Sequence, residues 1–155
     1  MNQIKIFSIA EKQKIERKLN EQFGIKRIKG LIIKTGSERL FIYQGKLNPK
    51  EIINLERLRI NLERTGIYFA KETNNEIRLS IEGVHIFKDQ ITKNIFELNA
   101  EQLEQWMKGN ELNISSGLKG FVVMKYKNDF VGTGKASAEK ITNFIPKNRR
   151  LKEKN

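Results

Sequence analysis

The residues best suited to chemistry lie near the end of the chain, where cations crowd around glycines. A glycine leaves space for another backbone to approach closely, and a Lys or Arg beside that space can donate to phosphate. An asparagine amide can pair with a base edge, and an aromatic ring can stack on an unpaired base. The candidate nucleic-acid-binding residues are Lys119, Lys125, Gly132, Gly134, Lys135, Asn143, Phe144, Lys147, Arg149 and Arg150, with Tyr126 as a second stacking ring.

Each residue type in this set has an expected role. The two glycines would let a sugar-phosphate backbone approach, the cations would supply affinity, and Asn143 would contact a base. Lys119 and Lys125 would be outer phosphate contacts if their side chains face the same way. An alternative stays open, in which the glycines form a β-bulge and the terminal cations are a frayed, solvated tail.

The sequence offers little for catalysis or metal binding. It has no cysteine, which excludes disulfides, thiolate metal sites and a cysteine nucleophile. The one histidine, His85, has no acidic cluster around it and is expected to be a strand residue rather than a ligand or base. Gly132-Thr133-Gly134 lacks the spacing of a dinucleotide-binding loop, and no Walker loop is present. We therefore expect no catalytic residue, no metal and no cofactor.

The charge of the chain favours a polyanionic partner. Lys and Arg total 30 against 18 Asp and Glu, which gives a net charge of +12. Residues 1–75 carry 16 basic and 8 acidic side chains and residues 119–155 carry 10 and 3, whereas residues 76–118 carry 4 and 7. Lys and Arg placed on phosphates release counterions, so this surplus suits RNA. In the first segment the cations are spread over predicted helix surfaces, where they can equally be solvated.

Nothing in the sequence indicates a membrane segment. No stretch approaches the ~18 apolar residues that a bilayer-spanning helix needs. The first ten residues are mixed in polarity and lack the apolar core of a signal peptide. We expect a soluble, cytoplasmic protein with no membrane partner.

The first half of the chain predicts helices that cover an antiparallel sheet. Ser8 and Glu11 form a capping box before a helix over 9–23, which ends at Gly24. Asn48 and Pro49 begin a second helix, whose apolar face of Ile52, Leu55, Leu58 and Leu62 continues to Gly66. Four β-rich runs predict two hairpins, at 28–34 with 39–43 and at 67–71 with 77–81.

After Gly83 the pattern changes to shorter strands and tight turns. Strands are predicted over 84–87, 95–98, 119–127 and 130–134, with Asn128-Asp129 as the turn of the last hairpin. A short helix is capped by Asn99 and closed by Gly109. This predicts an α+β chain, with a small N-terminal antiparallel sheet and two covering helices over 1–82, followed by a partly open mixed β barrel with a short helix over 83–155.

The C-terminal residues resemble those of a known family. Gly132-x-Gly134-Lys135, a spacer and Asn143-x-x-Pro146-Lys147-x-x-Arg150 resemble the end of the PUA-like RNA-binding domain that closes the Sun/fmu family of rRNA cytosine 5-methyltransferases. The preceding order is also similar, at Phe23-Gly24-Ile25, Arg64-x-Gly66-Ile67, Lys108-Gly109-Asn110-Glu111-Leu112 and Gly120. The chain is identified as a stand-alone, archaeal-type homologue of that C-terminal region.

The resemblance implies a small α+β module followed by a PUA-like pseudobarrel that positions structured RNA. The family often has an aromatic where Thr133 stands and another near Leu151, so this chain departs from it at two stacking positions. The family's methyl transfer uses a cysteine that adds covalently to the base. Because this chain has no cysteine and no room for a cofactor-binding domain, we expect a binding protein and not that enzyme.

The resulting hypothesis is an RNA-binding protein for rRNA or tRNA, acting in ribosome biogenesis or in targeting RNA modification. The resemblance also admits a separate RNA methyltransferase or a ribosome-assembly protein as a partner. Two alternatives remain, namely an assembly factor that docks proteins through its acidic middle segment and an RNA-modifying enzyme with a cryptic site.

Overall fold

Two β-sheets form the protein, whose computed structural model describes residues 4–57 and 66–152. The first sheet contains β1 (Ile4–Ile6), β2 (Leu31–Thr35), β3 (Arg39–Tyr43), β4 (Ile67–Thr73) and β5 (Glu76–Leu79). The second contains β6 (Ile95–Glu97), β7 (Gly120–Tyr126), β8 (Asp129–Ala136) and β9 (Ile141–Asn143). The helices are α1 (Ile9–Phe23), α2 (Pro49–Arg57), α3 (Ile81–Ile86) and α4 (Ala100–Met107).

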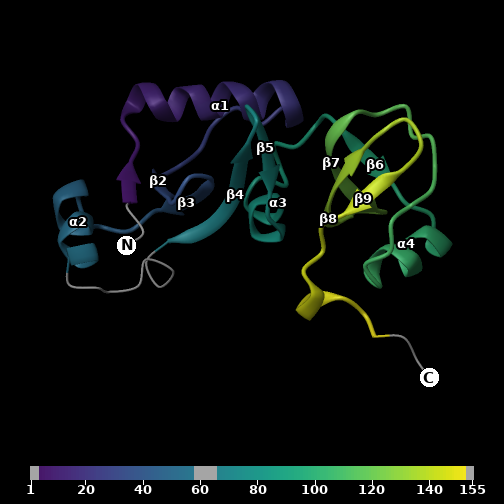
Figure 1. Cartoon of the computed structure of the whole chain (residues 1–155). Helices are drawn as coiled ribbons and strands as arrows, with labels where there is room; N and C mark the ends of the chain where they lie inside the picture. The colour runs from purple at the N-terminus through teal and green to yellow at the C-terminus, as the bar shows by residue number, and fades with distance from the viewer. Residues whose placement is uncertain (1–3, 58–65, 153–155) are drawn as a thin grey trace.

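Both sheets follow the order of the chain. The first, β1-β2-β3-β4-β5, is antiparallel throughout, whereas in the second, β6-β7-β8-β9, β6 runs parallel to β7. Figure 1 shows the sheets side by side, with α1 along the first and α4 beside the second. This confirms the predicted α+β class and the mixed second sheet. None of the helices in the described ranges is long and apolar enough to cross a membrane.

Helix α1 begins and ends at the residues that the sequence predicted. Ser8 and Glu11 form both bonds of the capping box, and Gly24 ends the helix at φ 81°. The carboxylate of Glu11 also accepts a hydrogen bond from Lys5, and this bond, followed by the bond from the Ser8 amide, lowers the pKa of Glu11 to about 2. The buried face of α1 then packs into the main core with Leu19 and Phe23.

The two faces of the first sheet bury different side chains. Alternation along β2 sends Ile32 into the core under α1 and Ile33 to the opposite face. There Ile33 packs with Phe41, Tyr43 and Ile52 of α2. The predicted continuation of this helix towards Gly66, with Leu58 and Leu62, lies outside the described residues.

The strand predicted over 84–87 is wrong, because these residues form the second half of helix α3 and its C-cap, Phe87. The Ser80 hydroxyl accepts from the Gly83 amide at 3.0 Å and caps α3, so His85 lies exposed in the last turn of a helix. A Cβ added to Gly83 would lie 2.1 Å from the Phe69 carbonyl oxygen. The cap and this close approach to β4 outweigh the β propensity of Val84 and Ile86, and the preceding strand ends at Leu79.

The second sheet lies between two cores. Val122 and Met124 pack with Trp106 of α4, whereas Phe121 and Val123 join the core of the first sheet.

The two-residue turn before β8 is Lys127-Asn128, with Lys127 at φ 53°, one residue earlier than predicted. The third antiparallel strand, β9, was not expected from the sequence. The predicted domain limit at 82/83 stays a prediction.

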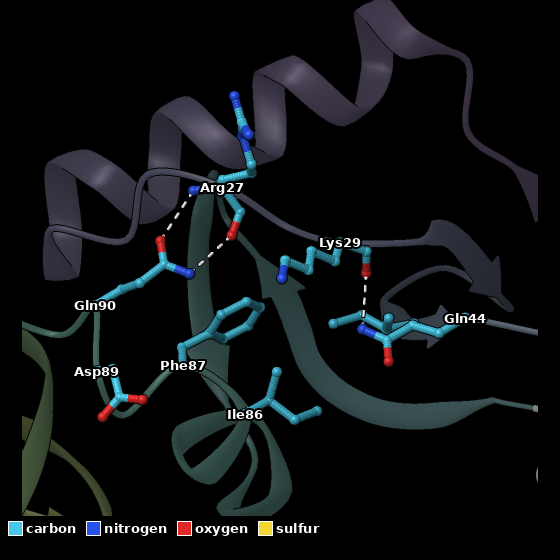
Figure 2. Close-up of a pocket in the computed structure, with 8 residues that line it drawn as sticks. Arg27, Lys29, Gln44, Ile86, Phe87, Asp89 and Gln90 are labelled. Atoms are coloured by element: carbon cyan, nitrogen blue, oxygen red, sulfur yellow. Dashed lines mark hydrogen bonds between the residues drawn. The ribbon is translucent and has the colours of Figure 1, made fainter.

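The side-chain amide of Gln90, a residue that follows α3, holds the connection between α1 and β2. The oxygen of Gln90 accepts from the backbone amides of Lys26 and Arg27 at 2.9 and 3.0 Å, and its nitrogen donates to the Arg27 carbonyl at 3.0 Å (Figure 2). Further along, the Gln44 amide donates to the Lys29 carbonyl at 3.1 Å. The Gln90 bonds fix this basic stretch of backbone to the residues after α3, and the Gln44 bond ties it to the end of β3.

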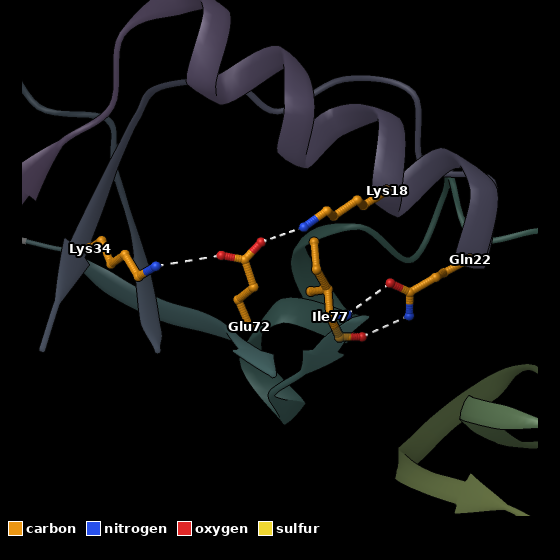
Figure 3. Close-up of polar contacts among 5 residues, drawn as sticks. All are labelled: Lys18, Gln22, Lys34, Glu72 and Ile77. Carbon is orange, nitrogen blue, oxygen red and sulfur yellow. Dashed lines mark hydrogen bonds and ion pairs between the residues drawn. The ribbon is translucent and has the colours of Figure 1, made fainter. Parts of the chain in front are cut away.

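Glu72 joins α1 to the first sheet. Its carboxylate accepts from Lys18 at 2.7 Å and from Lys34 at 3.5 Å (Figure 3). Burial alone raises the pKa of Glu72, but the hydrogen bond and charge of Lys18, and then those of Lys34, outweigh it and hold the pKa below its ordinary value. The Gln22 side chain adds two hydrogen bonds to the backbone of Ile77.

Candidate functional site

Gly132 and Gly134 on β8 are buried, and the protein itself fills the space beside them. A Cβ added to Gly134 would lie 2.6 Å from the Thr142 carbonyl oxygen and 2.8 Å from Cη2 of Trp106. At Gly132, φ is +126° and an added Cβ would lie 3.3 Å from Nε1 of Trp106. The expected approach of a sugar-phosphate backbone at these glycines is therefore wrong, because the missing side chains make room for the Trp106 ring.

Gly132 belongs to a β-bulge. The pairing of β8 with β7 shifts register between Val123 and Lys125, so that two residues of β8, Val131 and Gly132, stand opposite one. The indole N–H of Trp106 donates to the Val131 carbonyl in this bulge at 3.1 Å. The bulge alternative is thus confirmed for Gly132, and it positions β8 against α4.

Asn143 is 9% exposed, and its side chain is occupied by the protein. The amide nitrogen donates to the carbonyls of Trp106 and Asn110 at 2.8 and 3.0 Å, and the oxygen accepts from the Ile145 amide at 2.8 Å. Both amide hydrogens are therefore used within the protein, where Asn143 ties β9 to the end of α4. The base contact expected of Asn143 stays a prediction.

The cations after β9 do not form one free cluster. Arg149 is exposed but donates to Glu82 at 2.5 Å. Arg150 donates from Nε to the Ile145 carbonyl at 2.9 Å, and its side chain lies against Gly109. Lys147 is exposed in the 3-10 helix Lys147–Arg149, and its ammonium has no ion pair within the described ranges. Of these three cations, Lys147 is the one left available to phosphate.

Lys119 and Lys135 line the same groove. Both are exposed, and the groove, of about 680 Å³, runs between the start of β7 and the end of β8. Glu76 of β5 also lines it, so the groove meets the edge of the first sheet. Lys125 does not line this groove, and its ammonium lies 5.5 Å from the centre of the Phe130 ring.

Two aromatic rings continue from the groove towards the first sheet. The Lys135 ammonium lies 5.2 Å from the centre of the Phe121 ring, and the Phe121 and Phe144 rings are 6.1 Å apart. The Arg78 guanidinium lies 4.6 Å from the centre of the Phe144 ring. Cations on ring faces are held in place without an acidic partner. We call Arg78, Lys119, Phe121, Lys135 and Phe144 the cation–ring strip.

The strip contains two residues that the site prediction did not include. Phe121 is 8% exposed and supports the Lys135 side chain, while Arg78 comes from the other sheet. Alternation along β5 buries Ile77 and Leu79 and sends Arg78 to the opposite face, so the pattern indicated its direction. Its neighbour Phe144 could not be inferred, since Arg78 lies on the first sheet and Phe144 directly follows β9 of the second.

The second proposed stacking ring, Tyr126, lies away from the strip. It packs against the core around Trp106, and the Lys127 ammonium lies 5.4 Å from its ring centre. No group of three or more His, Asp and Glu side chains that could hold a metal ion occurs in the part of the chain that the structure describes.

Comparison with known proteins gives two findings. Residues 93–151 match the family described as the methyltransferase RsmF PUA domain. The chain is also similar to the ribosomal RNA small subunit methyltransferase F of Psychromonas ingrahamii, with 29% identity over 132 residues. These residues are 81% of this chain and 26% of the relative, so the chain spans about a quarter of that protein. The resemblance to the PUA-like region of such methyltransferases is confirmed.

Proposed function

We propose that this chain, a homologue of the PUA-like region of ribosomal RNA methyltransferases, binds RNA along the cation–ring strip. The observation that carries the proposal is the placement of Arg78, Lys119 and Lys135. No ion pair joins these three cations to an acid among the described residues. Lys119 and Lys135 line the groove, and Arg78 lines a smaller pocket together with Phe144. Cations that the fold leaves unneutralised are available to phosphates.

The rings give the strip a second means of binding RNA. Phe144 is half-buried and also lines a smaller pocket of about 150 Å³, shared with Arg78 and Arg149. An unpaired base can stack on such a ring while the backbone phosphates contact the neighbouring cations. The strip therefore suits a structured RNA with an unpaired loop or end better than a regular duplex.

Ribosomal RNA or tRNA is the proposed ligand, and a role in ribosome biogenesis or in targeting RNA modification is the proposed context. The similar protein's name specifies small-subunit ribosomal RNA, which makes a hairpin from that RNA the first ligand to test. A tRNA serves as the second.

The test compares two triple variants of the full chain with equal loss of charge. Arg78→Ala/Lys119→Ala/Lys135→Ala removes the cations of the strip, and Arg17→Ala/Lys14→Ala/Lys50→Ala removes one Arg and two Lys that are exposed on α1 and α2. Affinity for both RNAs is measured by fluorescence anisotropy over a range of salt concentrations. Loss of about three phosphate contacts lowers the slope of log affinity against log salt by ~2 to 3.

We expect this reduction in the strip variant and a much smaller one in the control. Equal losses in the two variants would assign binding to overall charge and would contradict the strip. A further variant, Phe144→Leu, keeps an apolar side chain but removes the stacking plane. It should weaken binding by roughly tenfold without changing the salt slope, since stacking contributes ~1–3 kcal/mol per base.

A further inference from the structure

A second hollow lies at the other end of α3 from the strip. It has a volume of about 290 Å³, near the lower end for small-molecule sites. It opens between the connection from α1 to β2, the end of β3 and the residues after α3 (Figure 2). Its lining consists of Arg27, Lys29, Ile42, Gln44, Ile86, Phe87, Asp89 and Gln90, which we call the α3 pocket.

The α3 pocket combines an apolar wall with one cation that reaches over it. Ile42 and Phe87 are 2% exposed and form the buried part of the wall, while Ile86 is 39% exposed at the mouth. Lys29 and Arg27 are exposed, and within the described ranges neither forms an ion pair. The Lys29 side chain extends over the pocket, whereas Arg27 lines it with its backbone and its guanidinium points away along α1 (Figure 2). Asp89 is the one acidic residue in the lining, and its carboxylate lies apart from the Lys29 ammonium (Figure 2).

The polar groups of this pocket are fixed in place before any ligand binds. Gln90 makes three hydrogen bonds to the backbone of Lys26 and Arg27, and Gln44 donates to the Lys29 carbonyl. These bonds hold the two cationic residues on a rigid connection rather than on a free loop. The Gln44 amide oxygen has no hydrogen-bond partner in the described part of the chain, so it remains available as an acceptor.

We propose that the α3 pocket binds one nucleotide of an RNA strand, an inference that rests on the proposed RNA binding. The apolar wall contacts the base, the Gln44 amide oxygen accepts from the base edge, and Lys29 binds the phosphate. Arg27, whose guanidinium extends beyond the pocket, contacts the next phosphate of the strand. A free nucleoside monophosphate has the same chemistry, and the experiment separates the two sources.

The position of the pocket agrees with a strand that also contacts the strip. The pocket that Arg78 and Phe144 line contains Ser80, Ile81 and Glu82, which begin α3, whereas Ile86 and Phe87 of the α3 pocket end it. A six-residue helix is about 9 Å long, a distance that a few nucleotides span.

The experiment uses the full chain and a matched pair of double variants. Arg27→Ala/Lys29→Ala removes the Lys that extends over the pocket and the Arg beside it, and Lys14→Ala/Arg17→Ala removes the same types from the exposed face of α1. The probes are a 12-nucleotide single-stranded oligoadenylate, adenosine monophosphate and inorganic phosphate. Binding is followed by anisotropy for the oligomer and, for all probes, by NMR signals of the Gln44 and Gln90 side-chain amides.

We expect the oligomer to shift both amide signals and the pocket variant to bind it at least tenfold more weakly than the control variant does. If the pocket variant lost no more oligomer affinity than the control variant and the amide signals did not move, nucleotide binding in the α3 pocket would be refuted. RNA binding along the cation–ring strip would not be affected by that result. Absence of oligomer and hairpin binding by the unaltered protein would instead refute the proposed function. Amide shifts with adenosine monophosphate but not with the oligomer would identify a free nucleotide as the ligand and overturn binding of a strand. Shifts with phosphate alone as large as with the nucleotide would overturn recognition of the base.

Discussion

Replacing Gly134 by alanine separates the two roles that a glycine can have in this strand. The added Cβ would lie 2.6 Å from the Thr142 carbonyl oxygen, 2.7 Å from Cγ2 of Ile141 and 2.8 Å from Cη2 of Trp106. Two of these atoms belong to packed side chains and one to the backbone of β9, so none can move aside cheaply. Since φ of Gly134 lies outside the left-handed region, the whole effect is steric.

We expect Gly134→Ala to lower the free energy of unfolding by ~1–3 kcal/mol, the range for adding a methyl group to a filled core. For a chain of 155 residues this lowers Tm by roughly 2–12 °C. The single tryptophan of the chain, Trp106, is in contact with the site, so its fluorescence in a urea titration reports the change directly. RNA affinity of the folded variant should stay within twofold of the unaltered protein.

Gly36→Ala provides the control for this measurement. Gly36 has nothing within 4 Å of an added Cβ, and its φ of +61° leaves backbone strain as the expected effect. A Gly134→Ala protein that kept its stability and lost RNA affinity would refute the packing role and restore the original expectation of close RNA approach. A loss of stability no larger than that of Gly36→Ala would also contradict the steric reasoning.

Two further predictions concern polar groups that the fold uses internally. Asn143→Ala leaves the Ile145 amide and the Asn110 carbonyl without this partner, while the Trp106 carbonyl keeps its bond from the Gly109 amide. The variant should lower the free energy of unfolding by ~1–3 kcal/mol, measured by urea titration, with RNA binding per folded molecule unchanged. The lowered pKa of Glu72 adds stability that is present above the ordinary glutamate value of 4.5 and is lost as pH falls below it. Thermal unfolding between pH 7 and pH 2 should therefore show a weaker acid dependence in Glu72→Gln, while an unchanged dependence would contradict this role.

Local signals in the sequence predicted much of the fold because they act over a few residues. The capping boxes at Ser8 and Asn99 each satisfy amides within three positions, and both helices begin where these residues indicate. The α3 segment differs, because Ser80 caps it but Val84, Ile86 and Phe87 have the composition of a strand. Close approach of Gly83 to β4 decided the outcome, and that contact joins residues from different elements.

The candidate site was harder to predict for the same reason. Gly132, Gly134 and Asn143 were predicted to contact RNA, whereas in the structure all three lie against or hydrogen-bond to Trp106, which lies on α4. A glycine beside a cation has the same appearance in the sequence whether it admits a ligand or an indole ring. Lys135 is exposed between buried Gly134 and Ala136, since alternation along β8 determines which side chains face solvent there. Lys119 is also exposed, but it precedes β7 and follows no strand pattern.

The strip depends on contacts between the two sheets. Thr133 donates from its hydroxyl to the Leu79 carbonyl at 3.1 Å, and this bond fixes β8 beside β5, next to Arg78. Phe121 packs in the core of the first sheet and also supports the Lys135 ammonium. The same contacts that join the sheets therefore determine the spacing of the cations along the groove. Because Arg78 comes from one sheet and the rings and lysines from around the other, the proposed RNA surface requires both halves of the chain in one folded unit.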